Sequence, residues 1–324
     1  MKVLQVLQPR KYQVREAPAP EPGPGQVLVK VLAVTTCPHW DIHILDGQPM
    51  FPGMTLAYPY TLGQPGHEAC GDIAAVGDGV RDLAVGQRVC VWRDRGHDVQ
   101  GCYAQFVAVD APDVIRVPEA LPPEACAPLE LAMCVSAHVL YAEKLDAIQG
   151  RRVGVFGLGP AGLVAVQLLR AAGAAHLVGV DPLPARRDLA QRLGADLVCG
   201  PDDEAFGTLP KRGHPDALEC AFDCVGSPAA VHQAMALTNH LVLLFAVQRE
   251  PYVFAPEYWG GLTLAGTRPH SREAAEYAAA RLADGRLDLG ALVSNTMRLG
   301  QYAEAVDLLK RREALKVAFL PQLG

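Results

Sequence analysis

The chain has 324 residues, half of them hydrophobic and a fifth charged, with a formal net charge of −6. This length predicts two domains, and the absence of an apolar run of about 18 residues predicts no membrane partner. The acidic balance also argues against a nucleic-acid partner. Nine cysteines without a dense spacing pattern predict reduced thiols and a cytoplasmic location.

The first part of the chain is predicted to be an all-β domain of the small-barrel type. Its apolar segments are short, rich in valine and separated by Pro and Gly, as strands of such a barrel are. They lie at residues 4–7, 26–34, 70–76, 87–92 and 103–109. The proline-rich segment 17–25 predicts an extended connection between two strands.

From about residue 150 onward, predicted strands alternate with helices. The strands lie at residues 153–156, 176–180, 197–199, 218–223, 240–245 and 262–265. Six such strands predict a doubly wound parallel sheet. A helix capped by Ser271, a helix at 302–310 and a strand at 316–320 follow, and we expect this tail to pair back with the first domain.

The strongest motif follows the first strand of this alternating half. Gly157, Gly159 and Gly162 have the G-x-G-x-x-G spacing, and Pro160 opens a helix whose N-terminus would face phosphates. Asp181, at the end of the next strand, would accept hydrogen bonds from ribose hydroxyls and repel a 2′-phosphate, which favours NAD over NADP. A glycine-rich turn of another α/β protein is the alternative, but the strand, the helix and the acid all stand where a dinucleotide needs them.

The β-rich half carries a second set of candidate residues. Cys37, His67, Glu68, Glu130 and Cys134 offer thiolate, imidazole and carboxylate ligands, the set that zinc prefers. Three protein ligands with one open position make a catalytic zinc site. Taken singly, each of these residues is more often a packed core residue than a ligand.

The order of the motifs resembles the medium-chain dehydrogenase/reductase superfamily, specifically its zinc-dependent alcohol and polyol dehydrogenase branch of the threonine and sorbitol type. The resemblance spans nearly the whole chain and is carried by PEPGPGQVLVKV, GHE, GCYAQFVAV, GLGPAG, AFDCVGSP and ALKVAFLP. It implies an α/β protein with a GroES-like β-barrel catalytic domain at 1–137 and a Rossmann domain at 138–267. It also implies a C-terminal return at 268–324 that completes the catalytic domain, an active site in the cleft between domains, and a homodimer or homotetramer.

The resemblance assigns roles to particular residues. It implies Cys37, His67, Glu68 and Glu130 as metal ligands, and Asp41 as the carboxylate that orients the ligand histidine. It implies proton transfer through His39 or His43. The implied cofactor residues are Gly157, Leu158, Gly159, Pro160, Ala161, Gly162, Asp181, Arg186, Val225, Phe245, Ala246 and Val247.

Three departures from the family pattern stand out. Three residues instead of two separate Cys37 from Asp41, so we expect Cys37 to bind zinc through a loop that bulges by one residue. His39 stands where the family has the Ser or Thr of a proton relay, and an imidazole can replace it or merely lie at a polar loop edge. Cys90 and Cys102 cannot build the four-cysteine structural zinc site of many relatives, so one catalytic zinc is expected.

These features predict reversible oxidation of an alcohol by NAD, with zinc as Lewis acid and a small-molecule polyol, sugar or amino alcohol as substrate. Two alternatives stay open at this point. One is a zinc-free quinone or enone reductase on the same fold, and the other is a non-catalytic NAD sensor.

Overall fold

The computed structural model describes residues 1–51, 53–267 and 270–323. The chain divides into two compact units. The first consists of Met1–Leu131, Ala278–Ala283 and Asp288–Gly324, and the second of Ala132–Tyr277 and Asp284–Leu287. The domain boundaries predicted at residues 137 and 267 stay a prediction.

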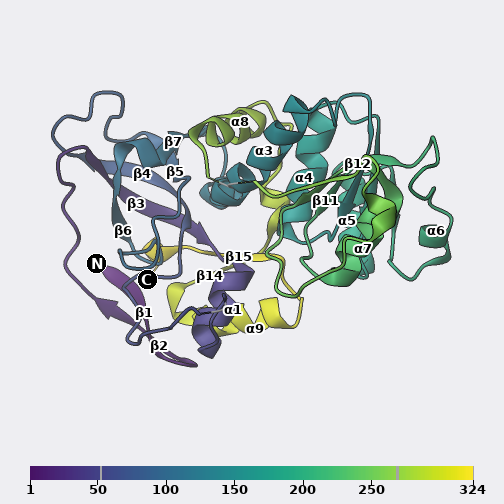
Figure 1. Ribbon diagram of the computed structural model, residues 1–324. Coiled ribbons are helices and arrows are strands. Elements are labelled where there is room, and N and C mark those ends of the chain that lie inside the picture. Colours follow the sequence, from purple (N-terminus) through teal and green to yellow (C-terminus); the bar gives the residue numbers. More distant parts are fainter. Residues whose placement is uncertain (52, 268–269, 324) are drawn as a thin grey trace. The chain divides into compact units, whose positions relative to one another are not determined.

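The first unit is rich in antiparallel β-structure (Figure 1). Its valines alternate along one strand, so that Val27, Val29 and Val31 are buried while Lys30 is exposed, as a sheet with one covered face requires. The larger sheet has the order β14-β15-β3-β4-β5-β7, with β6 paired to β3, and β1 and β2 form a separate hairpin. The bounds are β1 Lys2–Gln8, β2 Lys11–Glu16, β3 Gln26–Thr35, β4 Glu68–Val76, β5 Arg88–Val91, β6 Phe106–Asp110, β7 Val114–Arg116, β14 Val293–Met297 and β15 Lys316–Phe319.

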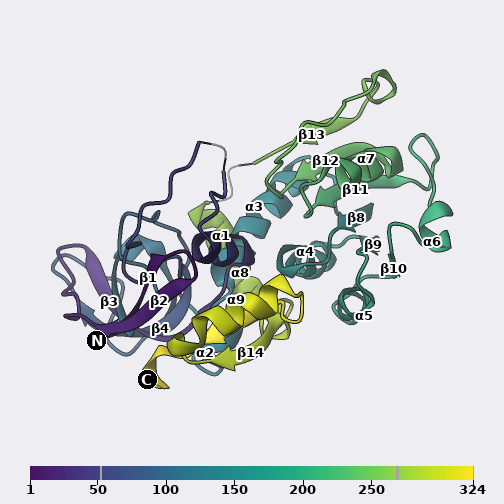
Figure 2. The same ribbon diagram turned by 90° about the horizontal axis from the view of Figure 1, so that it is seen from below.

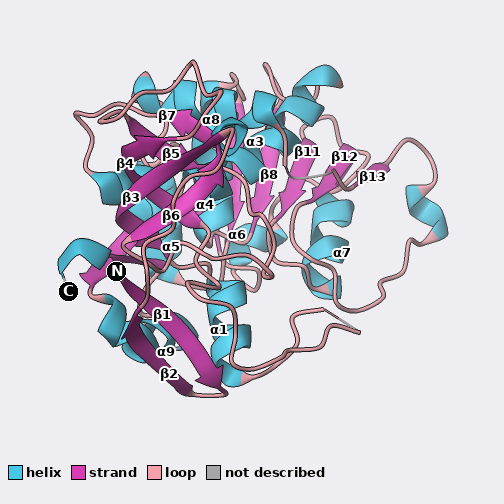
Figure 3. Ribbon diagram, turned by 90° about the vertical axis from the view of Figure 1, so that its left-hand side faces the viewer, coloured by secondary structure: helices cyan, strands magenta, loops and turns pink. Residues whose placement is uncertain are grey.

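The C-terminal segment completes this unit. Strand β15 pairs antiparallel with β3, with Ala318 opposite Thr35, and β14 pairs parallel with β15. Helix α9 (Tyr302–Lys310) packs against α1 (Pro38–Asp46), and Figure 3 shows both helices beside the β1–β2 hairpin. The prediction that the tail pairs back with the first domain is confirmed.

The second unit contains a six-stranded parallel sheet in the order β10-β9-β8-β11-β12-β13 (Figure 1). The order reverses at β8, and this is the doubly wound arrangement in which a dinucleotide binds beyond the carboxyl ends of the strands. The predicted α/β fold class is confirmed. The bounds are β8 Arg152–Phe156, β9 His176–Val180, β10 Leu197–Cys199, β11 Leu218–Asp223, β12 Thr238–Leu244, β13 Thr263–Ala265, α4 Pro160–Ala171, α5 Pro184–Arg192, α6 Glu204–Gly207 and α7 Pro228–Leu237.

The remaining helices are α2 (Pro123–Cys126), α3 (Leu129–Lys144) and α8 (Arg272–Ala283). By length and composition the stretch Pro123–Lys144 could cross a membrane, a property that the sequence analysis did not identify. However, 72% of its most apolar window is buried inside the protein, which is typical of a core helix.

Candidate active site

Cys37 lies at the start of helix α1, where the sequence analysis expected a bulged loop. It is the N-cap residue, and Pro38 occupies the first helical position, where a missing N–H is tolerated. The Asp41 N–H donates to the Cys37 carbonyl oxygen over 2.9 Å, as in the first turn of any helix. The extra residue between Cys37 and Asp41 is therefore accommodated by helix formation.

Strand pairing brings Cys37 to two other predicted ligands. Thr35, at the end of β3, lies opposite Glu68, the first residue of β4, so the residues just beyond these positions meet at one end of the sheet. The ligand atoms of Cys37, His67 and Glu68 all lie within 4.8 Å of one another. Thiolate, imidazole and carboxylate donors at this separation fit a zinc ion.

The His67 ring is held in a definite orientation. Its Nδ1 lies 2.9 Å from the carbonyl oxygen of Pro65, which fixes the tautomer and leaves Nε2 as the ligand atom. Nε2 lies 3.8 Å from Glu130 Oε2. Burial alone lowers the pKa of His67, but the hydrogen bond with Cys37 and the charge of Glu130 raise it overall, well above its ordinary value. Cys37 and Glu130 therefore favour a positive charge on the His67 ring.

Asp41 has a different partner from the one that we expected. Its carboxylate accepts hydrogen bonds from the hydroxyls of Tyr103 and Tyr302 and from the Cys37 N–H. Burial raises its pKa to about 6, although these donors counteract the shift. The His67 Nδ1 contacts the Pro65 carbonyl oxygen instead, and the role of Asp41 in orienting the ligand histidine stays a prediction.

Glu68 forms a buried ion pair with Lys316 of β15, a residue that the sequence analysis missed. The Lys316 Nζ donates to both Glu68 carboxylate oxygens over 2.6 Å and to the Thr36 carbonyl oxygen over 2.8 Å. The Thr35 hydroxyl donates to Glu68 Oε2 over 2.7 Å. Both charged side chains are 1% exposed. A lysine within an apolar strand was the signal that could have revealed the pair.

The two histidines predicted for proton transfer both lie on α1. His39 is exposed in the first turn, and His43 is half-buried one turn later. The His43 Nδ1 donates to the Gln48 carbonyl oxygen over 3.1 Å, so its Nε2 is the atom left for proton exchange. Their role in proton transfer stays a prediction.

The glycine turn of the second unit has the conformation that a nucleotide site needs. Gly157 has φ +87°, a left-handed conformation that favours glycine. A side chain at Gly162 would collide with the Gly157 carbonyl oxygen, so close packing of α4 on the turn requires glycine there. Gly159 is the N-cap of α4 and Pro160 its first residue, so the first backbone N–H groups of the helix face the turn. These residues fit a pyrophosphate.

Asp181 lies directly after β9, at the predicted ribose position. It is 3% exposed, and its two oxygens accept hydrogen bonds from the N–H groups of Leu158 and Leu183, each over 2.8 Å. The Arg186 guanidinium lies 3.7 Å from Asp181 Oδ2. The carboxylate is thus fixed against the glycine turn and keeps further lone pairs for a ligand.

Asp223, which the sequence analysis missed, organises the two predicted nicotinamide turns. Its carboxylate accepts hydrogen bonds from the N–H groups of Val225 and Gly226. Its carbonyl oxygen accepts from the N–H groups of Phe245 and Ala246. Burial raises the pKa of Asp223. The exposed side chains of Val225 and Val247 offer the apolar surface that a nicotinamide ring needs.

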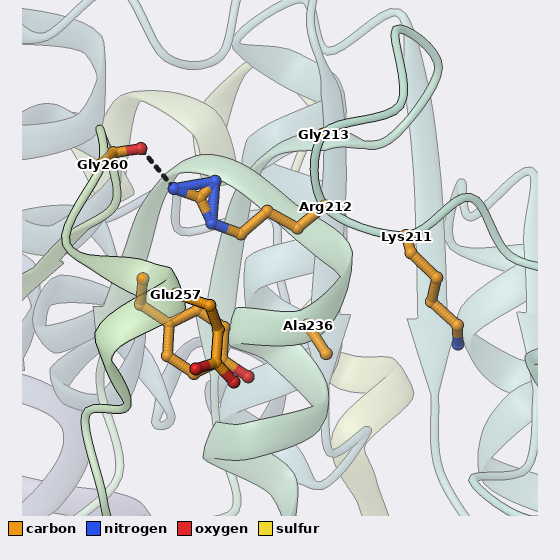
Figure 4. A pocket seen from close by; sticks show the side chains of 7 residues that line it. Lys211, Arg212, Gly213, Ala236, Glu257 and Gly260 are labelled. Atoms are coloured by element: carbon orange, nitrogen blue, oxygen red, sulfur yellow. Dashed lines mark hydrogen bonds between the residues drawn. The ribbon is translucent and has the colours of Figure 1, made fainter.

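A separate open pocket of about 530 Å³ lies in the second unit (Figure 4). Arg212 donates to the Gly260 carbonyl oxygen across it, and Glu257 and Tyr258 line its other side. None of its lining residues is among those predicted for the cofactor or the metal.

A doubly wound nucleotide sheet in one unit and a thiolate, imidazole and carboxylate cluster in the other define the class of metal-dependent, nucleotide-dependent dehydrogenases. Comparison with known proteins agrees with this class. The family model described as alcohol dehydrogenase GroES-like domain matches residues 23–119. The model described as zinc-binding dehydrogenase matches residues 160–247.

Characterised relatives extend the similarity to most of the chain. The alcohol dehydrogenase of Geobacillus stearothermophilus is 34% identical over 66% of this chain and 68% of its own. The L-threonine 3-dehydrogenase of Thermococcus kodakarensis is 28% identical, over 95% of this chain and 94% of its own length. The sorbitol dehydrogenase of Bacillus subtilis is 27% identical, over 99% of this chain and 97% of its own length.

Solved structures share the fold. The galactitol-1-phosphate dehydrogenase of Escherichia coli has a TM-score of 0.83 at 22% identity, covering 99% of this chain and 100% of that one. A Sinorhizobium meliloti protein described as a zinc-binding dehydrogenase, solved with NADP, has a TM-score of 0.80 at 26% identity, covering 99% and 100%. The chain belongs to the zinc-dependent alcohol and polyol dehydrogenase branch of the medium-chain dehydrogenase/reductase superfamily. It is an oxidoreductase whose family uses zinc and NAD(P).

Proposed function

We propose that the protein oxidises, reversibly and with NAD, an alcohol that carries a second polar group: a polyol, a sugar or an amino alcohol. The observation that carries the proposal is the approach of Cys37, His67 and Glu68 within 4.8 Å in a chain of this family. Relatives named for threonine, sorbitol and butanediol support the substrate class, since each of these molecules bears a second polar group.

One catalytic zinc would be held by the Cys37 thiolate and His67 Nε2, with Glu68 and Glu130 as the carboxylates that complete the site. When bound, zinc supplies a Lewis acid and NAD a hydride acceptor. Other residues of the chain support these ligands. The Pro65 carbonyl oxygen orients the His67 ring, and Lys316 balances the charge of Glu68. His39 and His43 Nε2 are the groups that we propose to carry the hydroxyl proton to solvent.

We propose no structural zinc. Cys90 and Cys102, which stand where many relatives have a four-cysteine zinc site, are both buried in the first unit. The Cys90 thiol donates to the carbonyl oxygen of Cys126. The zinc-free reductase and the NAD sensor are not favoured, because the relatives are named as alcohol, threonine and polyol dehydrogenases and the ligand cluster is assembled.

We predict a preference for NAD over NADP that depends on Asp181. A 2′-phosphate beside a buried carboxylate meets like charge, so Asp181→Asn should shift the ratio of kcat/KM for the two cofactors toward NADP by roughly tenfold. Asp188→Asn, the same charge loss at an exposed position of α5, should leave the ratio unchanged. Steady-state kinetics with both cofactors measure it. A wild-type preference for NADP would contradict the assignment.

We propose a homo-oligomer that forms through the edge strand β13. The segment before β13 projects beyond β12 and α7 (Figure 2) and exposes apolar side chains, with Trp259 83% and Val253 66% exposed. Large aromatic residues dominate the binding energy of protein interfaces. Trp259→Lys is therefore expected to raise the dissociation constant of the dimer at least about tenfold. Light scattering across a dilution series measures this constant. A monomeric wild-type protein at every concentration would contradict this.

We propose a cytoplasmic location and a small-molecule substrate as the main partner. All nine cysteines are free thiols in the structure, as expected in a reducing compartment. The proposed function itself is tested by a panel of polyols, sugars, amino alcohols and simple alcohols with NAD, followed by NADH absorbance. Turnover should be highest with substrates that bear a second polar group. A zinc-loaded enzyme that reduces NAD with none of them would overturn the proposal.

A further inference from the structure

Three hydrogen-bond donors converge on the fully buried carboxylate of Asp41. The Tyr103 hydroxyl lies 2.9 Å from both carboxylate oxygens, and the Tyr302 hydroxyl lies 2.9 Å from Oδ1. The third donor is the Cys37 N–H, 2.7 Å from Oδ2. The side chain of Asp41 is 0% exposed, so these donors replace the water that a carboxylate otherwise needs.

The two tyrosines come from distant parts of the chain and are themselves held firmly. Tyr302 is the first residue of α9, and Tyr103 lies just before β6. Their ring centroids are 5.5 Å apart, and the Tyr103 ring packs edge to face on Phe319 at 5.3 Å. Both tyrosines are 0% exposed. The hydroxyls are therefore fixed donors rather than mobile ones.

The Cys37 backbone depends on this carboxylate. As the N-cap residue, Cys37 has an extended conformation (φ −103°, ψ 104°), and its N–H lies outside the hydrogen-bond ladder of α1. The Asp41 side chain reaches back one turn and accepts a hydrogen bond from that N–H. The direction of the Cys37 thiol is thus set by a chain of contacts that begins at Tyr302 and Tyr103.

We propose that Tyr302 and Tyr103 are positioning residues of the metal site: they clamp Asp41, which holds the Cys37 backbone and so directs its thiolate toward the metal. The inference rests on the proposed zinc site and goes beyond it, since it assigns a role in the site to the C-terminal helix α9. Tyr103 also lies beside the segment before the ligand histidine, because the neighbouring Cys102 N–H donates to the Gly66 carbonyl oxygen over 2.7 Å.

Cobalt titration of the metal-free protein tests this role. Thiolate-bound Co²⁺ has a charge-transfer absorbance that reports the sulfur–metal contact directly. Tyr302→Phe and Tyr103→Phe each remove one hydroxyl and keep the ring. Each is expected to weaken Co²⁺ affinity by about tenfold or more and to change the charge-transfer band.

Tyr12→Phe is the matched control. The Tyr12 ring packs edge-on against Tyr302 at 5.5 Å, and its hydroxyl donates over 2.8 Å to the Gly300 carbonyl oxygen instead of Asp41. This variant should keep both the affinity and the band. Variants at Tyr302 and Tyr103 that lose thermal stability but bind Co²⁺ as the wild type does would overturn the inference and show a purely structural role.

If one tyrosine variant does not fold, as judged by near-ultraviolet circular dichroism, the other variant decides, because each hydroxyl reaches Asp41 independently. If the wild-type protein itself shows no thiolate charge-transfer band, the proposed zinc site falls and the inference with it. That result is distinct from a wild-type band that the variants leave unchanged.

Discussion

A Cys37→Ala variant is expected to lose its zinc and its turnover while it keeps the ability to bind NAD. Cys37 supplies the thiolate of the cluster with His67 and Glu68, whereas the nucleotide residues lie in the other unit. Removing a residue that only supports a metal ligand already costs 10- to 100-fold in metal affinity or activity, so loss of the ligand itself should lower kcat/KM by more than about 100-fold.

Metal analysis, steady-state kinetics and calorimetric NAD titration together measure this result. Cys70→Ala, which removes a buried thiol of β4 in the same unit, is the control and should keep zinc and activity. Activity that survives in Cys37→Ala would show that the metal is held by other residues and that Cys37 is not needed for catalysis.

Lys316→Met is expected to cause a large loss of stability. It leaves the Glu68 carboxylate buried with its charge unbalanced, and breaking a buried pair in this way costs about 3–5 kcal/mol in the free energy of unfolding. Urea unfolding of the metal-free protein measures it. The double variant Glu68→Gln, Lys316→Met should recover most of the loss, because neither charge then remains.

Lys310→Met is the matched control for this experiment. Lys310 pairs with Asp46 over 2.6 Å, the same distance as in the buried pair, but its side chain is 41% exposed. Its loss should cost less than about 1 kcal/mol, since water screens exposed ion pairs. Equal losses at Lys310 and Lys316 would show that burial does not control the energy of the Glu68 pair.

Much of the fold could be predicted because its signals are local. The glycine turn at Gly157–Gly162 and the acid at Asp181 lie within one strand–helix–strand unit, and Gly157 and Gly162 each meet a steric need at their own position. The alternation of strands and helices after residue 150 likewise predicts a parallel sheet without knowledge of any distant contact. The candidate ligands Cys37, His67 and Glu68 were identified by chemical type, and the β3–β4 pairing then brings them together.

The supporting residues could not be predicted because they act across long stretches of sequence. Lys316 and Glu68 are 248 residues apart, and Tyr302 and Asp41 are 261 residues apart. No local pattern shows which buried lysine meets which buried acid. The hydrogen bonds from Tyr103 and Tyr302 to Asp41 are equally beyond a local pattern, and the role of Asp41 in orienting the ligand histidine stays a prediction.

The proposed activity requires that this chain hold a catalytic zinc through Cys37 and His67 and use it to oxidise an alcohol with NAD. Metal analysis of protein purified without chelator, combined with an assay for NAD reduction by alcohols on the same sample, tests this requirement. We expect about one zinc ion per chain and alcohol-dependent NADH formation that disappears when zinc is removed and returns when it is restored. Less than about half an equivalent of zinc, with NADPH-dependent enone reduction by the same sample, would contradict it.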